Sequence, residues 1–80
     1  MELDPTPKFN RNIKKFSKSI RNKFYKQANF LVHNIRPPSL HAKKYDESTG
    51  TWQARVDKGV RFYFLIENDT YILLDIKYHD

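Results

Sequence analysis

Cysteine is absent from this 80-residue chain, so it has neither disulfide bonds nor thiolate metal sites. Only two glycines occur, which leaves no glycine-rich loop to cradle a nucleotide phosphate. No apolar run approaches the roughly 20 residues of a membrane-spanning helix, and Met1 to Lys8 lack the apolar block of a signal peptide. We therefore expect a single cytoplasmic domain over residues 1–80, with no membrane partner.

Acidic residues are also scarce. Nine Asp and Glu stand against 15 Lys and Arg, for a formal net charge of +6. Such a charge favours binding to a polyanion or to an acidic protein. The sequence contains no readable Ser-His-Asp or Cys-His arrangement and no histidine pair at metal-ligand spacing, so we expect no cofactor and no metal. What it does contain is aromatic residues, and six Phe, five Tyr and one Trp must supply much of the core.

The first half of the chain has the periodicity of helices. Apolar residues recur in steps of three and four from Phe9 to Ile35. Thr6 is placed to cap a first helix with Pro7 in its first turn, and the Ser-Lys-Ser sequence at 17–19 offers a break and a second cap. The second helix must end before Pro37, because a residue that precedes proline avoids the helical region.

After Pro38 the apolar period changes to two, which is typical of strands. A short strand is expected within "SLHAKKY", followed by strands at about 51–57, 60–66 and 70–78. The prolines at 5 and 7 allow the first residues to pair only briefly with a sheet. The pattern predicts an α+β, two-layer fold, in which an N-terminal helical hairpin packs on an antiparallel sheet of three to four strands.

The stretch "TWQARVDKGVRFYF" reads as a β-hairpin. A three-residue loop, 57–59, with Gly59 at positive φ keeps the apolar residues of both strands on one face. This loop predicts three cross-strand pairs: Val56 with Val60, Ala54 with Phe62, and Arg55 with Arg61.

The next hairpin is expected to turn at 67–69, which places Arg61 opposite Asp75. One sheet face is then covered by the helices, and the other carries polar and aromatic side chains. These are Gln53, Arg55, Arg61, Tyr63, Tyr71, Asp75, Lys77 and His79.

The two facing arginines have two interpretations. At about 5 Å they repel by about 0.8 kcal/mol in water and about 3 kcal/mol at an effective dielectric constant of 20. Either Asp75 neutralises Arg61 while Arg55 extends into solvent, or the pair binds an anion such as phosphate. Residues that border the same face favour nucleic acid: Lys43, Lys44, Lys58 and Lys77, with Tyr63, Tyr71 and Tyr78 to stack on bases.

Two histidines are candidates for proton transfer. RNA carries its own nucleophile in the 2′-hydroxyl, so cleavage needs a base, an acid and cations at the phosphate. His79 is the natural acid or base, although the alternative is an ordinary terminal histidine. His41 is either a second proton-transfer group or a loop residue, and His33 is a surface residue at a helix C-terminus.

The order of these strings resembles the RelE/ParE superfamily of bacterial toxin–antitoxin toxins. "PSLHAKKY", the hairpin "ARVDKGVRFYF" and the late "KYHD" are similar to the RelE-like mRNA interferase branch, and the helices at 9–35 also match. The resemblance implies a ribosome-dependent endoribonuclease that cleaves mRNA through 2′-hydroxyl attack and so inhibits translation. It also implies an acidic antitoxin, encoded nearby, as protein partner.

The resemblance assigns roles to individual residues. Arg61 corresponds to the arginine at the scissile phosphate, Arg55 to a basic position of the preceding strand, and His79 to the late acid/base position. Lys43 and Lys44 correspond to a basic strand that touches RNA, and Asp80 stands where one branch ends in tyrosine.

Two other functions stay open from the sequence. One is a ParE-like toxin that inhibits DNA gyrase without nuclease chemistry, and the other is an inactive, solitary RNA-binding domain. His79 and the arginine pair favour the nuclease, because a gyrase inhibitor needs no acid/base group there.

Overall fold

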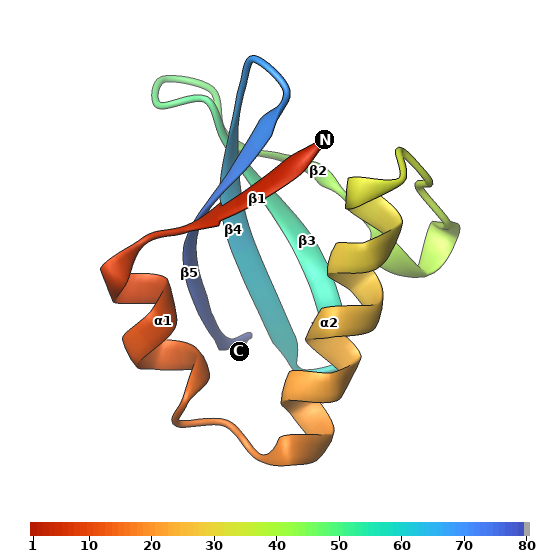
Figure 1. The fold of residues 1–80 in the computed structure, drawn as a ribbon, viewed down its shortest axis with the longest axis vertical. Helices are drawn as coiled ribbons and strands as arrows, with labels where there is room; N and C mark the ends of the chain where they lie inside the picture. The colour runs from red at the N-terminus through yellow and green to blue at the C-terminus, as the bar shows by residue number, and fades with distance from the viewer. Residues whose placement is uncertain (80) are drawn as a thin grey trace.

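The computed structural model describes residues 1–79, so the position assigned to Asp80 lies outside the described residues. Two helices and a 3₁₀ turn accompany five strands (Figure 1). In chain order these are β1 (Glu2–Pro5), α1 (Pro7–Ile13), α2 (Lys18–Val32), the 3₁₀ turn η1 (Pro38–Leu40), β2 (Lys43–Asp46), β3 (Thr51–Asp57), β4 (Val60–Glu67) and β5 (Thr70–Tyr78).

The sheet has five strands in the order β1-β5-β4-β3-β2, rather than the three to four that we expected. It is also mixed, because β1 runs parallel to β5 while the other pairs are antiparallel. The N–H of Glu2 donates to the Asp69 carbonyl at 2.9 Å, and that of Thr6 donates to the Leu73 carbonyl at 3.0 Å. An edge strand tolerates Pro5, because only one side of the strand is paired.

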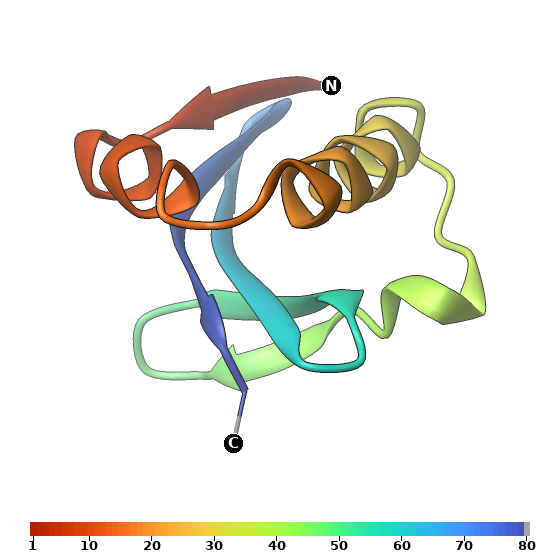
Figure 2. The same ribbon diagram turned by 90° about the horizontal axis from the view of Figure 1, so that it is seen from below.

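Both helices begin where the sequence predicts. The Thr6 hydroxyl accepts a hydrogen bond from the Phe9 N–H, and the Ser17 hydroxyl accepts one from the Ile20 N–H, each at 3.2 Å. Figure 2 shows the two helices on the same side of a strongly twisted sheet. Neither helix is long and apolar enough to cross a membrane within residues 1–79.

The core lies between the helices and the sheet, as an α+β two-layer fold requires. Phe62 and Phe64 are fully buried in β4, and the ring of Phe24 from α2 meets Phe62 edge-on with centroids 5.1 Å apart. Phe9 of α1 also contacts Phe24, at 5.1 Å between centroids, which joins the two helices over the sheet. Because the helices cover one face only, the opposite face stays open.

The β3–β4 hairpin confirms part of the predicted register. Arg55 faces Arg61 and Ala54 faces Phe62, as expected. The pairing of Val56 with Val60 is wrong, because Asp57 faces Val60 and Val56 is an extra residue in a bulge. The turn therefore has two residues, Lys58 and Gly59, and Gly59 is not at positive φ. The Gly59 N–H instead donates to the Asp57 side chain at 3.0 Å, which closes the turn.

A second bulge corrects the β4–β5 pairing. Tyr63 faces Asp75 and Phe64 faces Leu73, so Leu74 is the extra residue. The predicted opposition of Arg61 and Asp75 is wrong, because Arg61 faces Lys77. The predicted turn at 67–69 is also wrong, because Glu67 faces Thr70 and the turn has only two residues, 68 and 69. This shorter turn shifts the first half of β5 by one residue and so exchanges its faces. Tyr71, which we expected on the open face, is only 1% exposed in the core.

Candidate functional site

Three cations stand abreast on the open face of the sheet. Arg55, Arg61 and Lys77 occupy directly paired positions on β3, β4 and β5. Among residues 1–79, none of the three forms an ion pair with a carboxylate. Lys77 turns toward Tyr63 and places its Nζ 4.9 Å from the ring centroid. This cation–π contact draws one charge away from the arginines, which are left facing each other.

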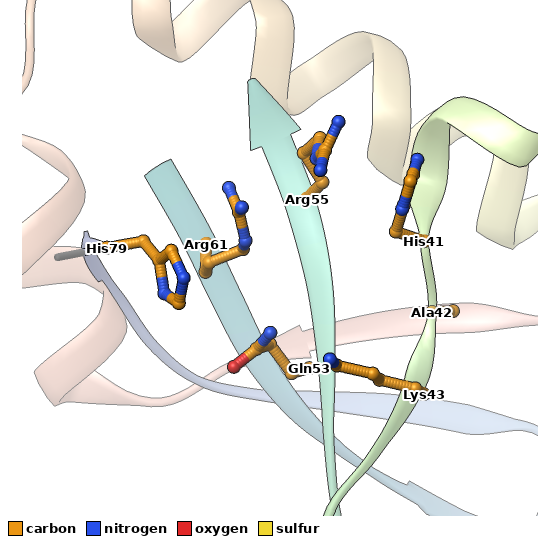
Figure 3. A pocket seen from close by; sticks show the side chains of 7 residues that line it. All are labelled: His41, Ala42, Lys43, Gln53, Arg55, Arg61 and His79. Atoms are coloured by element: carbon orange, nitrogen blue, oxygen red, sulfur yellow. The ribbon is translucent and has the colours of Figure 1, made fainter. Parts of the chain in front are cut away.

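The two arginines line a cavity of about 290 Å³, which we call the arginine pocket. Figure 3 shows their side chains entering it from neighbouring strands. Its lining contains no acidic side chain among the described residues, so the pocket has a positive potential suited to an anion. The lining residues are His41, Ala42, Lys43, Gln53, Arg55, Arg61 and His79.

The Arg61 guanidinium is fixed by the hairpin that it closes. Its Nη1 donates to the carbonyls of Asp57, Lys58 and Val60 at 2.8, 3.2 and 3.2 Å. The residue is only 8% exposed, so these carbonyls compensate a charge that has left bulk water. The other guanidinium nitrogens make no hydrogen bond within the described part of the chain, and they remain available to a ligand.

Arg55 is the less satisfied member of the pair. Its Nε is buried and has no hydrogen-bond partner among the described residues. A buried donor without a partner costs about 1–3 kcal/mol. The backbone of Arg55 is held from the helix side, where the buried Gln27 donates to its carbonyl at 2.9 Å.

Two imidazoles flank the arginine pair in Figure 3, with His79 on the side of Arg61 and His41 on the side of Arg55. The N–H of His79 donates to the Gly59 carbonyl at 2.8 Å, which ties the end of the chain to the hairpin turn. His41 follows the 3₁₀ turn with a φ of 47°, in the left-handed region. Such a backbone costs of the order of 1 kcal/mol in a non-glycine residue, and strain of this kind clusters at functional sites.

Asp75 does not neutralise the site. Its Oδ1 accepts from Asn12 Nδ2 at 2.6 Å and from the Ile76 N–H at 2.9 Å, and Oδ2 lies 3.5 Å from Lys8 Nζ. Burial alone would raise the pKa of Asp75, but the hydrogen bonds from Asn12 and Ile76 and the charge of Lys8 lower it. The carboxylate therefore fastens α1 to β5, and the first interpretation of the arginine pair is wrong.

The remaining candidates lie outside the pocket lining. Lys44 Nζ is 5.2 Å from the centroid of the Trp52 ring, and Lys58 is exposed in the hairpin turn. Tyr63 is 7% exposed beneath Lys77. Burial raises the pKa of the Tyr63 phenol, and Tyr45 and Asp75 raise it further against the opposing effect of Arg61.

Two glutamines support this site: strand alternation placed Gln53 on the open face without a role, and Gln27 was not singled out from the sequence. Gln53 is buried and lies in the lining of the arginine pocket beside Lys43, its partner on β2. Gln27 lies in the apolar stripe of α2, three positions after Phe24. A polar residue within such a stripe was the sequence signal that its side chain is buried and hydrogen-bonded. Its Nε2 also donates to the Ser39 carbonyl at 3.3 Å, so it links α2, β3 and the segment that leads to His41.

Comparison with known proteins identifies the fold. No family model and no curated protein sequence matches the chain. Among solved structures, YafQ from E. coli matches with a TM-score of 0.82 and 15% identity over 96% of this chain and 91% of that one. A metal-bound toxin from Helicobacter pylori matches with a TM-score of 0.79 and 14% identity over 99% of this chain and 94% of that one. A chain of the RelB–RelE antitoxin–toxin complex from Methanococcus jannaschii matches with a TM-score of 0.76 and 16% identity over 94% of this chain and 88% of that one.

These identities establish a shared fold and leave the site to be judged on its own residues. Within residues 1–79, no three His, Cys, Asp or Glu side chains gather as metal ligands. The arrangement that does exist is a pair of guanidinium groups between two imidazoles. It can bind a phosphate and exchange protons on both sides of it.

Proposed function

From the premise that the chain has the fold of the RelE-like toxins, we propose that it is the toxin of a toxin–antitoxin pair. Its activity is the ribosome-dependent, metal-independent cleavage of mRNA, which inhibits translation in the cytoplasm and arrests growth. The observation that carries this proposal is the arginine pocket, in which two arginines without an ion pair among residues 1–79 and two histidines converge on one open sheet face.

The pocket supplies what RNA cleavage requires. The 2′-hydroxyl oxygen attacks the adjacent phosphorus, its proton passes to one imidazole, and the bond to the 5′-oxygen breaks as the other imidazole donates a proton to that oxygen. The products are a 2′,3′-cyclic phosphate and a 5′-hydroxyl end, so atoms and charge balance. Arg55 and Arg61 stabilise the additional negative charge of the phosphorane, because their N–H groups are already in place.

An acidic antitoxin is the protein partner that fits this surface. The net charge of +6 and the cations of the open face favour an acidic segment that covers the arginine pocket. The neighbouring structures support this choice, since YafQ was crystallised with DinJ and RelE with RelB.

The test is to induce the chain in growing bacteria and to map transcript ends. We expect cuts at ribosome-occupied codons, with cyclic phosphate on one side and a 5′-hydroxyl on the other. His79→Gln should reduce cleavage by about 100-fold or more, because it removes a proton-transfer group. Arg55→Ala should reduce it by a similar factor, because it removes charge at the phosphate.

Arg11→Ala is the matched control, since it removes an exposed cation from α1, within the helix layer. It should cleave like the parent chain. Blocked replication with intact transcripts would replace the proposal with gyrase inhibition, and RNA binding without cuts or toxicity would leave an inactive RNA-binding domain. Loss of cleavage in Arg11→Ala equal to that in Arg55→Ala would show that general charge, and not the pocket, is responsible.

A further inference from the structure

Tyr45 has a large exposed aromatic ring beside the arginine pocket. It is 56% exposed on β2, two residues after the pocket residue Lys43. Tyr45 is the extra residue of a bulge between Lys44 and Asp46, so strand alternation does not place its ring. Its contact with the ring of Tyr63, which belongs to the open face, does place it there. The core does not explain this ring, since the core lies on the opposite face of the sheet.

A rigid support lies behind Tyr45. Its ring meets that of Tyr63 edge-on, with centroids 4.9 Å apart and planes at 65°. Tyr63 cannot move aside easily, because it is 7% exposed and Lys77 lies over its ring at 4.9 Å. Tyr63 is therefore too covered to stack on a base itself, and it fixes the orientation of the ring that is exposed.

The end of β2 is also held in place. After Tyr45, the Asp46 Oδ1 accepts from the Ser48 N–H at 3.0 Å and from the Ser48 hydroxyl at 2.7 Å. These bonds lower the pKa of Asp46 and close the turn into β3. Tyr45 is thus presented from a fixed strand end, one step along the open face from the arginines.

We propose that Tyr45 is a stacking platform for the base of the nucleotide next to the phosphate held in the arginine pocket. The ligand is a single-stranded RNA, whose backbone follows Lys43 and the arginines while one base rests on the exposed ring. The proposal rests on the proposed function, because it assumes that the pocket binds an RNA phosphate. Stacking on an aromatic face is tolerant of sequence, so the platform fixes position more than base identity.

The test uses a fluorescein-labelled 2′-O-methyl ApApA, which cannot be cleaved because its 2′-oxygens are blocked. Three further probes each replace one base with an abasic sugar, and anisotropy titrations give the dissociation constants. For the parent chain, one abasic probe should bind at least fivefold more weakly than the complete trinucleotide. Tyr45→Ala should bind the complete trinucleotide and that abasic probe equally, and as weakly as the parent chain binds the abasic probe. Tyr45→Phe should behave like the parent chain.

Tyr25→Ala is the matched control. Tyr25 is also 56% exposed and also meets a supporting ring edge-on, that of Phe24 at 5.8 Å, but it belongs to α2. The Tyr25→Ala variant should bind the abasic probe more weakly than the complete trinucleotide by the same factor as the parent chain does. If Tyr45→Ala keeps that difference while Arg55→Ala still loses binding, the platform is wrong and the arginine pocket stands. If the parent binds no probe, or binds equally after Arg55→Ala, the platform is overturned, whereas the proposed function stands or falls on the mapped transcript ends.

Discussion

The two faces of the sheet use the same strands for different purposes. Phe62 and Arg61 are neighbours on β4, and both are buried, but their surroundings differ. The aromatic rings of Phe24 and Phe64 surround Phe62, whereas the carbonyls of the hairpin turn surround the Arg61 guanidinium. Strand alternation alone separates these environments, so one strand can hold the core on one side and a charged pocket on the other.

This comparison teaches that burial has opposite consequences on the two faces. Burial of Phe62 stabilises the fold because apolar surface leaves water. The arginines oppose folding slightly, through mutual repulsion and through the Nε of Arg55, which has no hydrogen-bond partner within residues 1–79. A pocket that costs stability is consistent with selection for a ligand.

The largest expected loss of stability comes from a substitution on the face of the sheet that the helices cover. Phe62→Ala removes a ring that is 0% exposed and should lower the free energy of unfolding by about 3–5 kcal/mol. An 80-residue domain has about 4–12 kcal/mol in total, so much of its stability is lost. Urea denaturation followed by circular dichroism measures this change.

Arg55→Ala is the counterpart on the open face. The substitution relieves the repulsion and the cost of an Nε that has no partner among the described residues, but it also loses the packing of the side-chain stem, so the free energy of unfolding should change by less than about 1 kcal/mol. A Phe62→Ala protein as stable as the parent, or an Arg55→Ala protein that unfolds, would remove the distinction between the faces.

A smaller effect concerns pH and the bond between α1 and β5. The folded pKa of Asp75 is lowered, so its carboxylate contributes stability above the unfolded pKa of about 3.9. That contribution is lost as the pH falls through the lower folded pKa. Asp75→Asn, which keeps an acceptor for Asn12, should therefore lose less stability between pH 5 and pH 3 than the parent chain does.

Thermal unfolding at a series of pH values measures this difference. Identical losses on acidification in both proteins would mean that the Asp75 carboxylate does not contribute to the acid sensitivity. Replacing Lys8 by methionine provides a control, because it removes one cause of the lowered pKa and should reduce the acid loss more weakly than Asp75→Asn.

The sequence was sufficient for the features that depend on local chemistry. Thr6 and Ser17 cap the helices as predicted, and alternation placed Arg55 opposite Arg61. His79 and His41 were both singled out, and both line the arginine pocket.

The bulges were not predictable, because neither Val56 nor Leu74 carries a local signal for an extra residue. The two-residue turn at 68 and 69 moved Tyr71 into the core, and the bulge at Leu74 then moved Lys77 opposite Arg61. The support of the Arg61 guanidinium by turn carbonyls also depended on the true length of that turn.

The central claim is that Arg55 and Arg61 together hold the scissile phosphate. A crystal structure of the chain with a dinucleotide whose 2′-oxygen is replaced by hydrogen tests it most directly. We predict a phosphate in the arginine pocket, with oxygens about 2.7–2.9 Å from nitrogens of both guanidinium groups and with His41 and His79 on either side. A nucleotide bound at saturating concentration whose phosphate touches neither arginine would contradict the account.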